Sequence, residues 1–586
     1  LRWVKTVETG CLYCNCKGSD KPFAGSFLDK PLMMVTQTKG QPWAKQFIQS
    51  WPGALLLSLM LTLLMLKEYI LPLNGILHHR DYILQLWNLW LVNESILSGQ
   101  NPYFTNLQYY PLGAHLGRHV LSPGFFPLTF LVWAISGADT FYPIYTYKII
   151  ILLSYALILF FSYLVLREME LPWWACVVPA IAYAFCDFYL FHVHRLHLIS
   201  GFFIPAIAFF LIRLFKKPAL STALICGVLL AAGLYFTELT LHIYLAILFL
   251  ALIVSLFPQE RQLLITRLRM LGLKPMALAA LVFVLVAFIF VYNWLASDAQ
   301  PPNSEEAIRY SANLMGFFIP APISTPLYGQ LFAVLNGYIT VGSPGYEVFI
   351  GFPLLLLGLL ALFQANQKVV RIASLLALIF FILSLGSKLK LFGLDLDVPL
   401  PYALFASTPP FNVGRTPVRF VALALFFWMI VAAHGLAWLQ HRLTFKYGPS
   451  AALAAMILIF IWTIAEAYSP IRPEQSYTVP PQVEKIVAGP VINLPLKYHD
   501  PWALLPQIFY KQPTATGYVS RNSKKQQEYF ETLRVLYAEA LQTGSCQKFV
   551  DLGFRNIVIW PGVSNDVIFS LTHSPACSMN VVDLRN

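Results

Sequence analysis

Long apolar runs, separated by short polar segments, dominate this chain. A hydrophobic stretch of about 20 residues crosses a bilayer as an α-helix. Runs of that kind lie at approximately 51–72, 142–166, 172–192, 198–215, 219–236, 239–257, 275–297, 347–365, 370–386, 418–440 and 449–469. The pattern predicts an all-α polytopic membrane protein with about 11 transmembrane helices.

The run at 121–136 is shorter and contains Pro123 and Pro127. If this run does not cross, every short loop on the N-terminal side of the membrane is basic, which fits the positive-inside rule. Those loops carry Arg167; Arg213, Lys216 and Lys217; Arg261, Arg267, Arg269 and Lys274; Lys368 and Arg371; and Arg442 and Lys446. We therefore expect 121–136 to be an interfacial or re-entrant helix, with the N-terminus cytoplasmic.

Three regions follow from this topology. We expect residues 1–50 to be a cytoplasmic tail, of which 1–32 are expected to be upstream translation before Met33. Residues 51–469 form the transmembrane domain, whose first external loop, 73–141, is large. The internal turns are short and the external segments long and polar, so the protein is expected to work on its outer face.

The tail from 470 to 586 is predicted to be a small extracytoplasmic α/β domain. Charge rises sharply after Pro470. Short β-branched runs at 491–494 ("VINL") and 556–560 ("NIVIW") are typical of strands, and 528–541 has the spacing of an amphipathic helix.

Composition excludes some functions. Only 12% of the residues are charged, against about 25% in a soluble domain. The net charge of +12 lies mostly in short loops, so it indicates orientation and contact with anionic lipid head groups, and no nucleic-acid partner is expected.

The eight cysteines say little about function. Cys546 and Cys577 fall in the external tail, where an oxidising compartment would permit a disulfide, and the sequence leaves open whether they pair. Three of the other cysteines lie in apolar runs and are expected to be core residues: Cys176, Cys186 and Cys226. The remaining three, Cys11, Cys14 and Cys16, have the spacing of a metal site but lack a fourth ligand.

Asp81 begins a segment with helical spacing directly after the first span. Asp81, Gln85 and Asn88 share one face, and Gly99 ends the segment. One interpretation makes Asp81 a helix N-cap. The other makes it a base beside an anionic ligand, because Arg80 and two histidines precede it at the membrane mouth.

The second polar cluster is "FHVHRLHLIS". His194, Arg195 and His197, with His192 before them, gather at an external helix end and provide the fixed donors that a phosphate site needs. Snorkelling basic residues are the alternative. Glu238 lies between two spans, where a carboxylate is a functional candidate or a hydrogen-bonded structural residue.

The loop 387–417 adds further candidates. Arg415 faces the external interface and is expected to contact the same ligand. Asp395 and Asp397 form an Asp-x-Asp triplet, which arises often by chance, and no metal ligand is assigned there. The sequence contains no P-loop, GxGxxG, nucleophile elbow or HExxH motif, which disfavours nucleotide-driven chemistry.

Together, Asp81, the helix to Gly99 and "GQNPYFT" resemble the first external loop of the GT-C superfamily of glycosyltransferases. The stretches "HRLHLISGFFIP", "TELTLHIYLAILF" and "LGFRNIVIWPG" are similar to a largely uncharacterised bacterial group of GT-C-type membrane proteins. The likeness implies a multi-pass enzyme of the bacterial inner membrane that uses a polyprenyl-phosphate-linked sugar.

By this resemblance Asp81 matches the family's external-loop carboxylate, which deprotonates or orients an acceptor hydroxyl. The family's usual acidic pair is absent, because Tyr82 follows Asp81. No cofactor is therefore assigned, and a divalent metal stays an alternative. The acceptor is a lipid, a glycan or a protein. A lipid or lipid-linked-glycan transporter and a non-catalytic assembly protein on the same scaffold remain alternatives.

Overall fold

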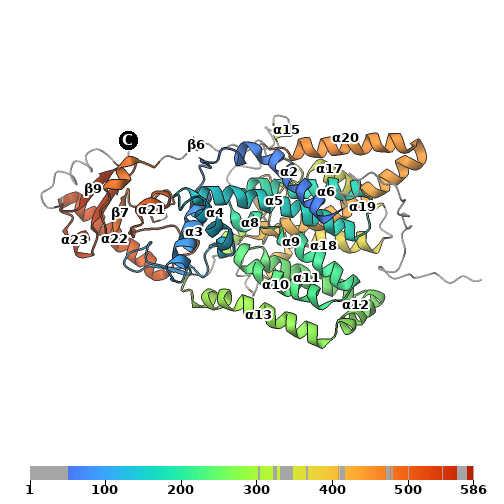
Figure 1. The fold of residues 1–586 in the computed structure, drawn as a ribbon, viewed down its shortest axis with the longest axis horizontal. Coiled ribbons are helices and arrows are strands. Elements are labelled where there is room, and N and C mark those ends of the chain that lie inside the picture. Colours follow the sequence, from blue (N-terminus) through green and yellow to red (C-terminus); the bar gives the residue numbers. More distant parts are fainter. Residues whose placement is uncertain are drawn as a thin grey trace, which may run out of the picture.

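The computed structural model describes residues 50–300, 304–320, 326–329, 348–363, 367–406, 408, 416–469, 475–476, 479–498, 501–543, 545–561, 563 and 577–584. Within them a helical bundle runs along the long axis, with an α/β domain at one end and the surface helix α12 (Pro258–Leu271) at the other (Figure 1). Residues 1–49, which include Cys11, Cys14 and Cys16, lie outside the described residues.

Among the described residues, seven helical segments are long and apolar enough to cross a membrane. They are Trp51–Ile70 (α2), Tyr142–Glu168 (α5), Trp173–Phe191 (α6 and α7), Leu196–Lys216 (α8 and α9), Leu273–Ala296 (α13), Pro417–Tyr447 (η5 and α19) and Pro449–Ala467 (α20). Between two of them, α11 (Thr240–Ser255) and α12 meet at a bend of 120°, and counting this pair as one span gives eight.

The expected count of about 11 spans is therefore not confirmed. The remaining apolar runs do form helices among the described residues, but these have 17 residues or fewer, below the typical span of about 20. They are α10 (Leu220–Phe236), α17 (Phe352–Leu362) and α18 (Lys368–Ser384). The run at 121–136 is also short, with η1 (Pro123–Phe125) leading into α4 (Phe126–Ile135), and its interfacial placement stays a prediction.

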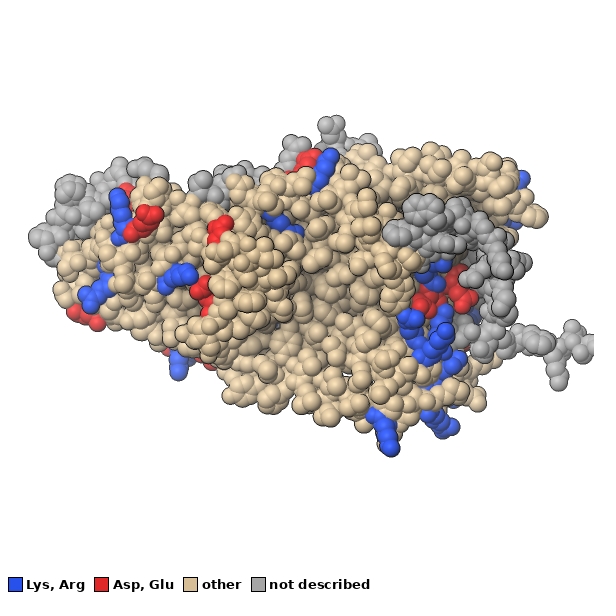
Figure 2. Space-filling view, in the orientation of Figure 1, with Lys and Arg blue, Asp and Glu red and all other residues tan. Residues whose placement is uncertain are grey.

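The surface agrees with a membrane-embedded middle. In the face that Figure 2 shows, a broad region without charged side chains separates the charged groups of the α/β domain from a cluster near α12. Beneath this surface one apolar core joins the spans, and its fully buried side chains include Trp87, Tyr82 and Tyr147.

The external segment after α2 begins with α3 (Arg80–Leu97). Two short antiparallel pairs accompany it, β2 (Phe104–Thr105) with β3 (Ala114–His115), and β1 (Gly75–Ile76) with β6 (Gln475–Ser476). A third pair forms elsewhere, β4 (Lys388–Leu391) with β5 (Leu394–Pro399).

The C-terminal part combines a small sheet with helices, and its standing as a separate domain stays a prediction. Its parallel sheet has the order β7-β8-β9, with β7 at Val491–Leu494, β8 at Asn556–Ile559 and β9 at Asn580–Asp583. Helices α21 (Leu504–Tyr510), α22 (Lys524–Thr543) and α23 (Gln547–Asp551) accompany it. Both sequence-predicted strands and the predicted helix are present, and Cys546 and Cys577 form a disulfide.

Buried polar contacts tie this C-terminal part to the external loop. Gln507 of α21 is fully buried, accepts a hydrogen bond from Trp87 Nε1 at 2.9 Å and donates to the Leu107 carbonyl at 2.7 Å. Thr514 exchanges backbone hydrogen bonds with Leu107 and Tyr110. These contacts place the loop that follows Thr514 against the first turn of α3.

Candidate functional site

Asp81 lies in the first turn of α3, and its carboxylate does not cap the helix. The N-cap is His79, whose Nδ1 accepts the Asp81 backbone N–H at 3.1 Å. The interpretation of Asp81 as the N-cap is therefore wrong: the helix begins one residue earlier, and His79 satisfies the amide. Arg80 is exposed, and its side chain makes no hydrogen bond or ion pair with another described residue.

The Asp81 carboxylate has two partners from distant parts of the chain. Arg195 Nε donates to Oδ2 at 2.6 Å, and the Tyr518 hydroxyl donates to Oδ1 at 3.3 Å. Burial raises the pKa of Asp81, but the charge and hydrogen bond of Arg195 outweigh it and lower that pKa to about 2. The group is a carboxylate at any physiological pH.

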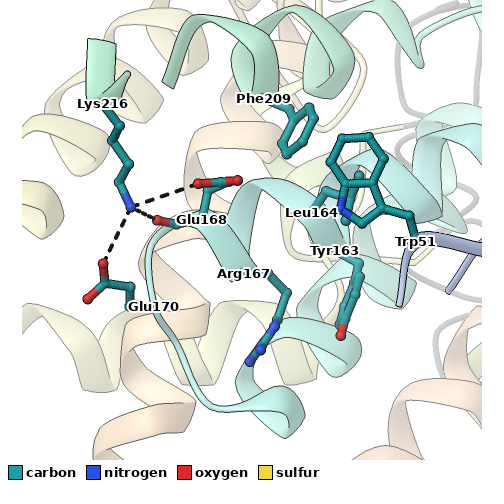
Figure 3. A pocket seen from close by; sticks show the side chains of 8 residues that line it. All are labelled: Trp51, Tyr163, Leu164, Arg167, Glu168, Glu170, Phe209 and Lys216. Carbon is teal, nitrogen blue, oxygen red and sulfur yellow. Dashed lines mark hydrogen bonds and ion pairs between the residues drawn. The ribbon is translucent and has the colours of Figure 1, made fainter. Parts of the chain in front are cut away.

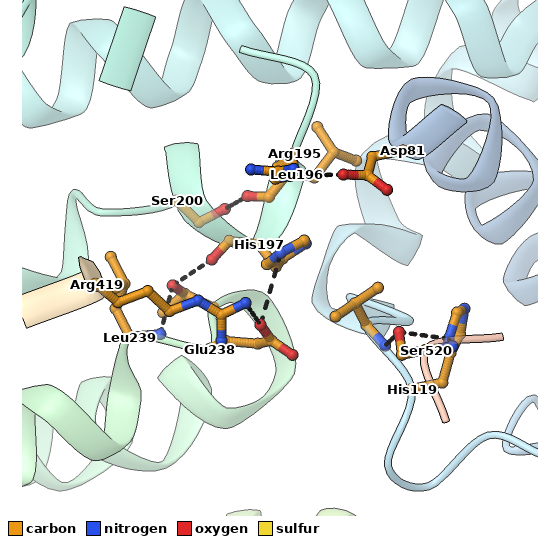
Figure 4. Close-up of polar contacts among 12 residues, drawn as sticks. Asp81, His119, Arg195, Leu196, His197, Ser200, Glu238, Leu239, Arg419 and Ser520 are labelled. Atoms are coloured by element: carbon orange, nitrogen blue, oxygen red, sulfur yellow. Dashed lines mark hydrogen bonds and ion pairs between the residues drawn. The ribbon is translucent and has the colours of Figure 1, made fainter. Parts of the chain in front are cut away.

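A second interaction centres on Glu238, at the turn between α10 and α11. Its Oε2 lies 2.5 Å from Arg419 Nη2 and 3.6 Å from His197 Nε2 (Figure 4). The backbone holds this arrangement, because the His197 carbonyl accepts from both the Thr237 hydroxyl, at 2.6 Å, and the Glu238 amide, at 3.3 Å.

The two pairs belong to one site. Arg195 and His197 lie two residues apart at the start of α8 (Leu196–Ile199), and each contacts one of the two carboxylates. The positive charge that His197 would carry also lowers the pKa of Asp81, which reflects its proximity. The site thus presents two arginines and two carboxylates at the same end of the bundle.

Two imidazoles stand beside Asp81. The rings of His79 and His194 have centroids 3.6 Å apart, and His194 Nε2 is buried without a hydrogen-bond partner among the described residues. Burial lowers the pKa of His79 to about 4, and burial together with the Arg195 charge lowers that of His194. Both rings are neutral at pH 7. His194 is therefore able to act as a ligand, whereas His79 would have to give up the contact between its Nδ1 and the Asp81 amide, because its other ring nitrogen carries the proton.

These residues could hold a divalent metal. One ligand atom from each of His79, Asp81 and His194 lies within 4.8 Å of the others. Two neutral imidazoles and a carboxylate are a typical zinc ligand set, and the unpartnered His194 Nε2 fits that role. A metal here would compete with the Arg195 guanidinium for Asp81 Oδ2.

The C-terminal part closes one side of the site. Ser520 donates its backbone N–H to His119 Nδ1 at 3.0 Å (Figure 4). His119 Nε2 lies 3.0 Å from Asn88 Oδ1 on α3. Burial lowers the pKa of His119 to about 3, so this ring links the two segments as a neutral acceptor and donor. The Ser520–His119 contact holds this segment in place, so that Tyr518, two residues before Ser520, lies against Asp81.

The sequence-predicted residues are thus largely brought together. Asp81, His194, Arg195, His197 and Glu238 share the site, whereas Arg80 is exposed beside it. Arg415 lies outside the described residues.

Sequence reasoning assigned no role to three participants. His79 caps α3, Arg419 pairs with Glu238, and Tyr518 contacts Asp81. Arg419 carried a signal, since it is an arginine at the predicted external end of a span. Asp395 and Asp397 are instead in an exposed hairpin, where Asp397 pairs with Lys388 at 2.7 Å.

No protein-family model and no curated protein matches the chain. Two solved structures are similar in shape. An oligosaccharyltransferase from Archaeoglobus fulgidus, in complex with zinc and sulfate, is 14% identical, with a TM-score of 0.42 over 79% of this chain and 62% of that one. ArnT from Cupriavidus metallidurans, bound to undecaprenyl phosphate, is 10% identical, with a TM-score of 0.42 over 92% and 89%.

The chain thus spans less than two thirds of the oligosaccharyltransferase. Likenesses at this level decide neither the family nor the reaction. The contacts of the site itself have to support any function.

Proposed function

We propose that the protein is an inverting glycosyltransferase that moves a sugar from a polyprenyl-phosphate donor to an acceptor on the extracytoplasmic face of the bacterial inner membrane. The observation that supports this most is the Asp81–Arg195 ion pair at one end of a membrane bundle. It joins the two groups that such a reaction needs, a carboxylate for the acceptor hydroxyl and a cation for the phosphate.

The donor phosphate would bind at the two arginines. Arg195 and Arg419 are charged at all relevant pH values, and guanidinium groups bind phosphate oxygens through paired hydrogen bonds. Their present partners are the carboxylates of Asp81 and Glu238, at 2.6 and 2.5 Å. An arriving phosphate would compete for the same N–H donors and draw Arg195 away from Asp81.

That competition would prepare Asp81 as a base. A carboxylate whose pKa is about 2 accepts a proton poorly, and Arg195 is the cause of that low value. When the guanidinium turns to the phosphate, burial is left as the main influence and the pKa of Asp81 rises. Donor binding and base activation are then one event.

The transfer is a single displacement. The acceptor oxygen forms a bond to the anomeric carbon while the bond from that carbon to the phosphate oxygen breaks. The polyprenyl phosphate leaves with the electron pair, stabilised by Arg195 and Arg419, and the acceptor proton passes to Asp81. Attack from the face opposite the phosphate inverts the anomeric centre.

The acceptor would enter on the side of the C-terminal part. Tyr518 donates to Asp81 Oδ1, so its hydroxyl occupies the position from which an acceptor hydroxyl would approach that oxygen. The acceptor is a lipid, a glycan or a protein that reaches the membrane surface from outside.

A divalent metal would be held by His79, Asp81 and His194. When bound, it would supply positive charge to the leaving phosphate. Without a metal, Asp81 is the base described above, and the two imidazoles are neutral hydrogen-bonding groups beside the donor. With a metal, all three residues would be ligands.

The experiment compares envelope glycans and glycolipids by mass spectrometry in a deletion strain that carries wild type, Asp81→Asn or Asp397→Asn. Asp397 is 91% exposed in the β4–β5 hairpin and serves as the matched control. Transferase function predicts a sugar that disappears on deletion and returns with wild type and Asp397→Asn only.

The other outcomes separate the alternatives. If deletion blocks export of a complete glycan or lipid without removing any sugar, the transporter is correct. If Asp81→Asn restores the profile, the scaffold role is correct and the transferase proposal fails.

A further inference from the structure

A polar pocket lies at the opposite end of the bundle from Asp81 (Figure 1). It is a cavity of 280 Å³ where the start of α2, the end of α5 and the end of α9 (Phe203–Lys216) meet (Figure 3). Its charged lining consists of Arg167, Glu168, Glu170 and Lys216. None of these residues belongs to the site of the proposed transfer.

Helix α5 extends from the Asp81 site to the pocket, so its length gives the distance between them. Near its start, Tyr147 contacts Tyr82, the residue after Asp81, with the two rings tilted and their centroids 4.5 Å apart. Arg167 lies twenty residues further along the same helix. At about 1.5 Å per residue this is about 30 Å, the thickness of the hydrocarbon core. The pocket therefore lies at the opposite membrane surface.

Positive charge exceeds negative charge around this pocket. Lys216 Nζ lies 3.9 Å from Glu168 and 3.5 Å from Glu170, and it also donates to the Glu168 carbonyl. Arg213 pairs with Glu168 at 3.4 Å. The carboxylates of Glu168 and Glu170 are therefore both paired with cationic side chains.

Arg167 is the cation that is left over. Its Nη1 donates to the Leu171 carbonyl at 3.2 Å, and no described carboxylate lies within ion-pair distance of it. Arg267 adds further charge nearby, because its Nη1 donates to the Lys216 carbonyl at 3.5 Å. An anion entering the pocket would meet an uncompensated guanidinium.

The opposite wall of the pocket is apolar and aromatic. Trp51, which begins α2, is 46% exposed, and its ring lies edge-on to Phe209 at a centroid distance of 5.4 Å. Arg213 stacks over the Trp51 ring at 5.0 Å. An exposed tryptophan at a helix end is typical of the level of lipid head groups.

A buried hydroxyl completes the lining. Tyr163 is 6% exposed, and its hydroxyl has no hydrogen-bond partner among the described residues. Figure 3 shows its ring beside the Arg167 side chain, one turn further along α5. A buried polar group without a partner is unfavourable, and an oxygen-bearing ligand would remove that penalty.

We propose that this pocket binds the phosphate head group of an anionic phospholipid from the leaflet opposite the transfer site. Arg167 and Lys216 hold the phosphate oxygens, the Tyr163 hydroxyl donates to one of them, and Trp51 contacts the start of the acyl chains. A basic pocket between membrane helices, open to the head-group layer and walled by aromatic side chains, matches this amphipathic ligand.

The test is native mass spectrometry of the full-length protein in detergent, titrated with phosphatidylglycerol, phosphatidylethanolamine or inorganic phosphate. We expect a retained adduct with phosphatidylglycerol. We expect Arg167→Gln to weaken it about tenfold, since a charge-assisted hydrogen bond is lost. Arg442→Gln is the control, an arginine of α19 (Val421–Tyr447) that stacks on Trp438 away from the pocket.

Tyr163→Phe guards against a folding artefact, because it removes one hydroxyl that has no partner and keeps the ring. It should weaken the adduct about threefold and leave the melting temperature unchanged or higher. Equal binding of both lipids, equal retention by Arg167→Gln and Arg442→Gln, or binding of inorganic phosphate as tight as that of the lipid would each overturn the proposal.

Discussion

Arg195 Nε lies 2.6 Å from Asp81 Oδ2, although the two residues are 114 positions apart in the chain. This contact joins the first turn of α3 to the start of α8. Both side chains are mostly buried, at 29% and 21% exposure. This ion pair stabilises the resting site and keeps the Asp81 carboxylate ionised. In the proposed reaction Arg195 exchanges that carboxylate for the donor phosphate.

Asp81→Asn should reduce sugar transfer by about 10²–10⁴-fold, because an amide cannot take the acceptor proton. The variant keeps the size of the side chain and its hydrogen-bond acceptor for Tyr518. Transfer to a short acceptor in purified membranes is the measurement, with Asp397→Asn as the control. Wild-type turnover by the Asn variant would remove Asp81 from the catalytic role.

The pH dependence of the Asp81 step should change when Arg195 is removed. In the wild type Asp81 has a pKa of about 2 and His79 one of about 4, so neither titrates between pH 5 and 8 in the resting enzyme. In Arg195→Gln the depressing charge is gone and burial remains, which moves the acid limb of kcat/KM upward. An acid limb at the same pH in both proteins would contradict the assigned pairing.

The same pair predicts an acid-dependent stability. The folded-state pKa of Asp81 lies below its ordinary value of 3.8, so its stabilisation is present above pH 3.8 and is lost as the pH falls through about 2. The difference amounts to about 2 kcal/mol. His79 acts in the same direction at higher pH, since its lowered pKa destabilises the folded state as the pH falls from 6.5 towards 4.

This should appear as a difference between two variants. Wild type should lose melting temperature below pH 4 more steeply than Arg195→Gln, in which the ion pair is already absent. The Arg195 charge also lowers the pKa of His79, so its removal reduces the acid penalty from His79 as well and acts in the same direction. Parallel curves from pH 6 to pH 3 would show that the pair does not stabilise the fold.

Gln507→Leu should loosen the C-terminal part from the bundle. The substitution leaves Trp87 Nε1 and the Gln512 carbonyl without their buried partner, at a cost of about 2–4 kcal/mol. It also removes one donor from the Leu107 carbonyl, which keeps its hydrogen bonds from Thr514. Limited proteolysis should then release the C-terminal part sooner. Gln542→Leu, at an exposed position of α22, is the control. Equal cleavage of both variants would show that other contacts carry the docking.

Much of the fold was predictable because lipid and water impose a simple pattern. Eleven apolar runs were expected, and each of those within the described residues is helical. The number of crossings was not predictable, because the length of an apolar run does not show where its helix begins and ends. In α17, for example, the helix starts only at Phe352, after Gly351 with a φ of +90°.

The site residues that could be predicted from the sequence are ionisable residues next to long apolar runs. His194, Arg195, His197 and Glu238 were identified because ionisable groups at a membrane boundary are rarely without function. The pairings were not predictable, since they connect residues more than 100 positions apart. The capping role of His79 was obscured because Asp is the commoner N-cap, and Tyr518 looked like any aromatic residue of a soluble domain.

The Cys546–Cys577 disulfide gives a test of which side of the membrane carries the C-terminal part. It closes a segment of 31 residues around β8. Thiol-reactive polyethylene glycol should fail to label these cysteines in intact membranes unless a reductant is added first, because disulfides persist only in an oxidising compartment. Cys546→Ser together with Cys577→Ser should lower the stability of this part by about 3 kcal/mol, seen as a lower melting temperature. Buried Cys226 in α10 should stay unlabelled with and without reductant and is the internal control. Labelling of both tail cysteines before reduction would place the C-terminal part in the cytoplasm, and the transfer site with it.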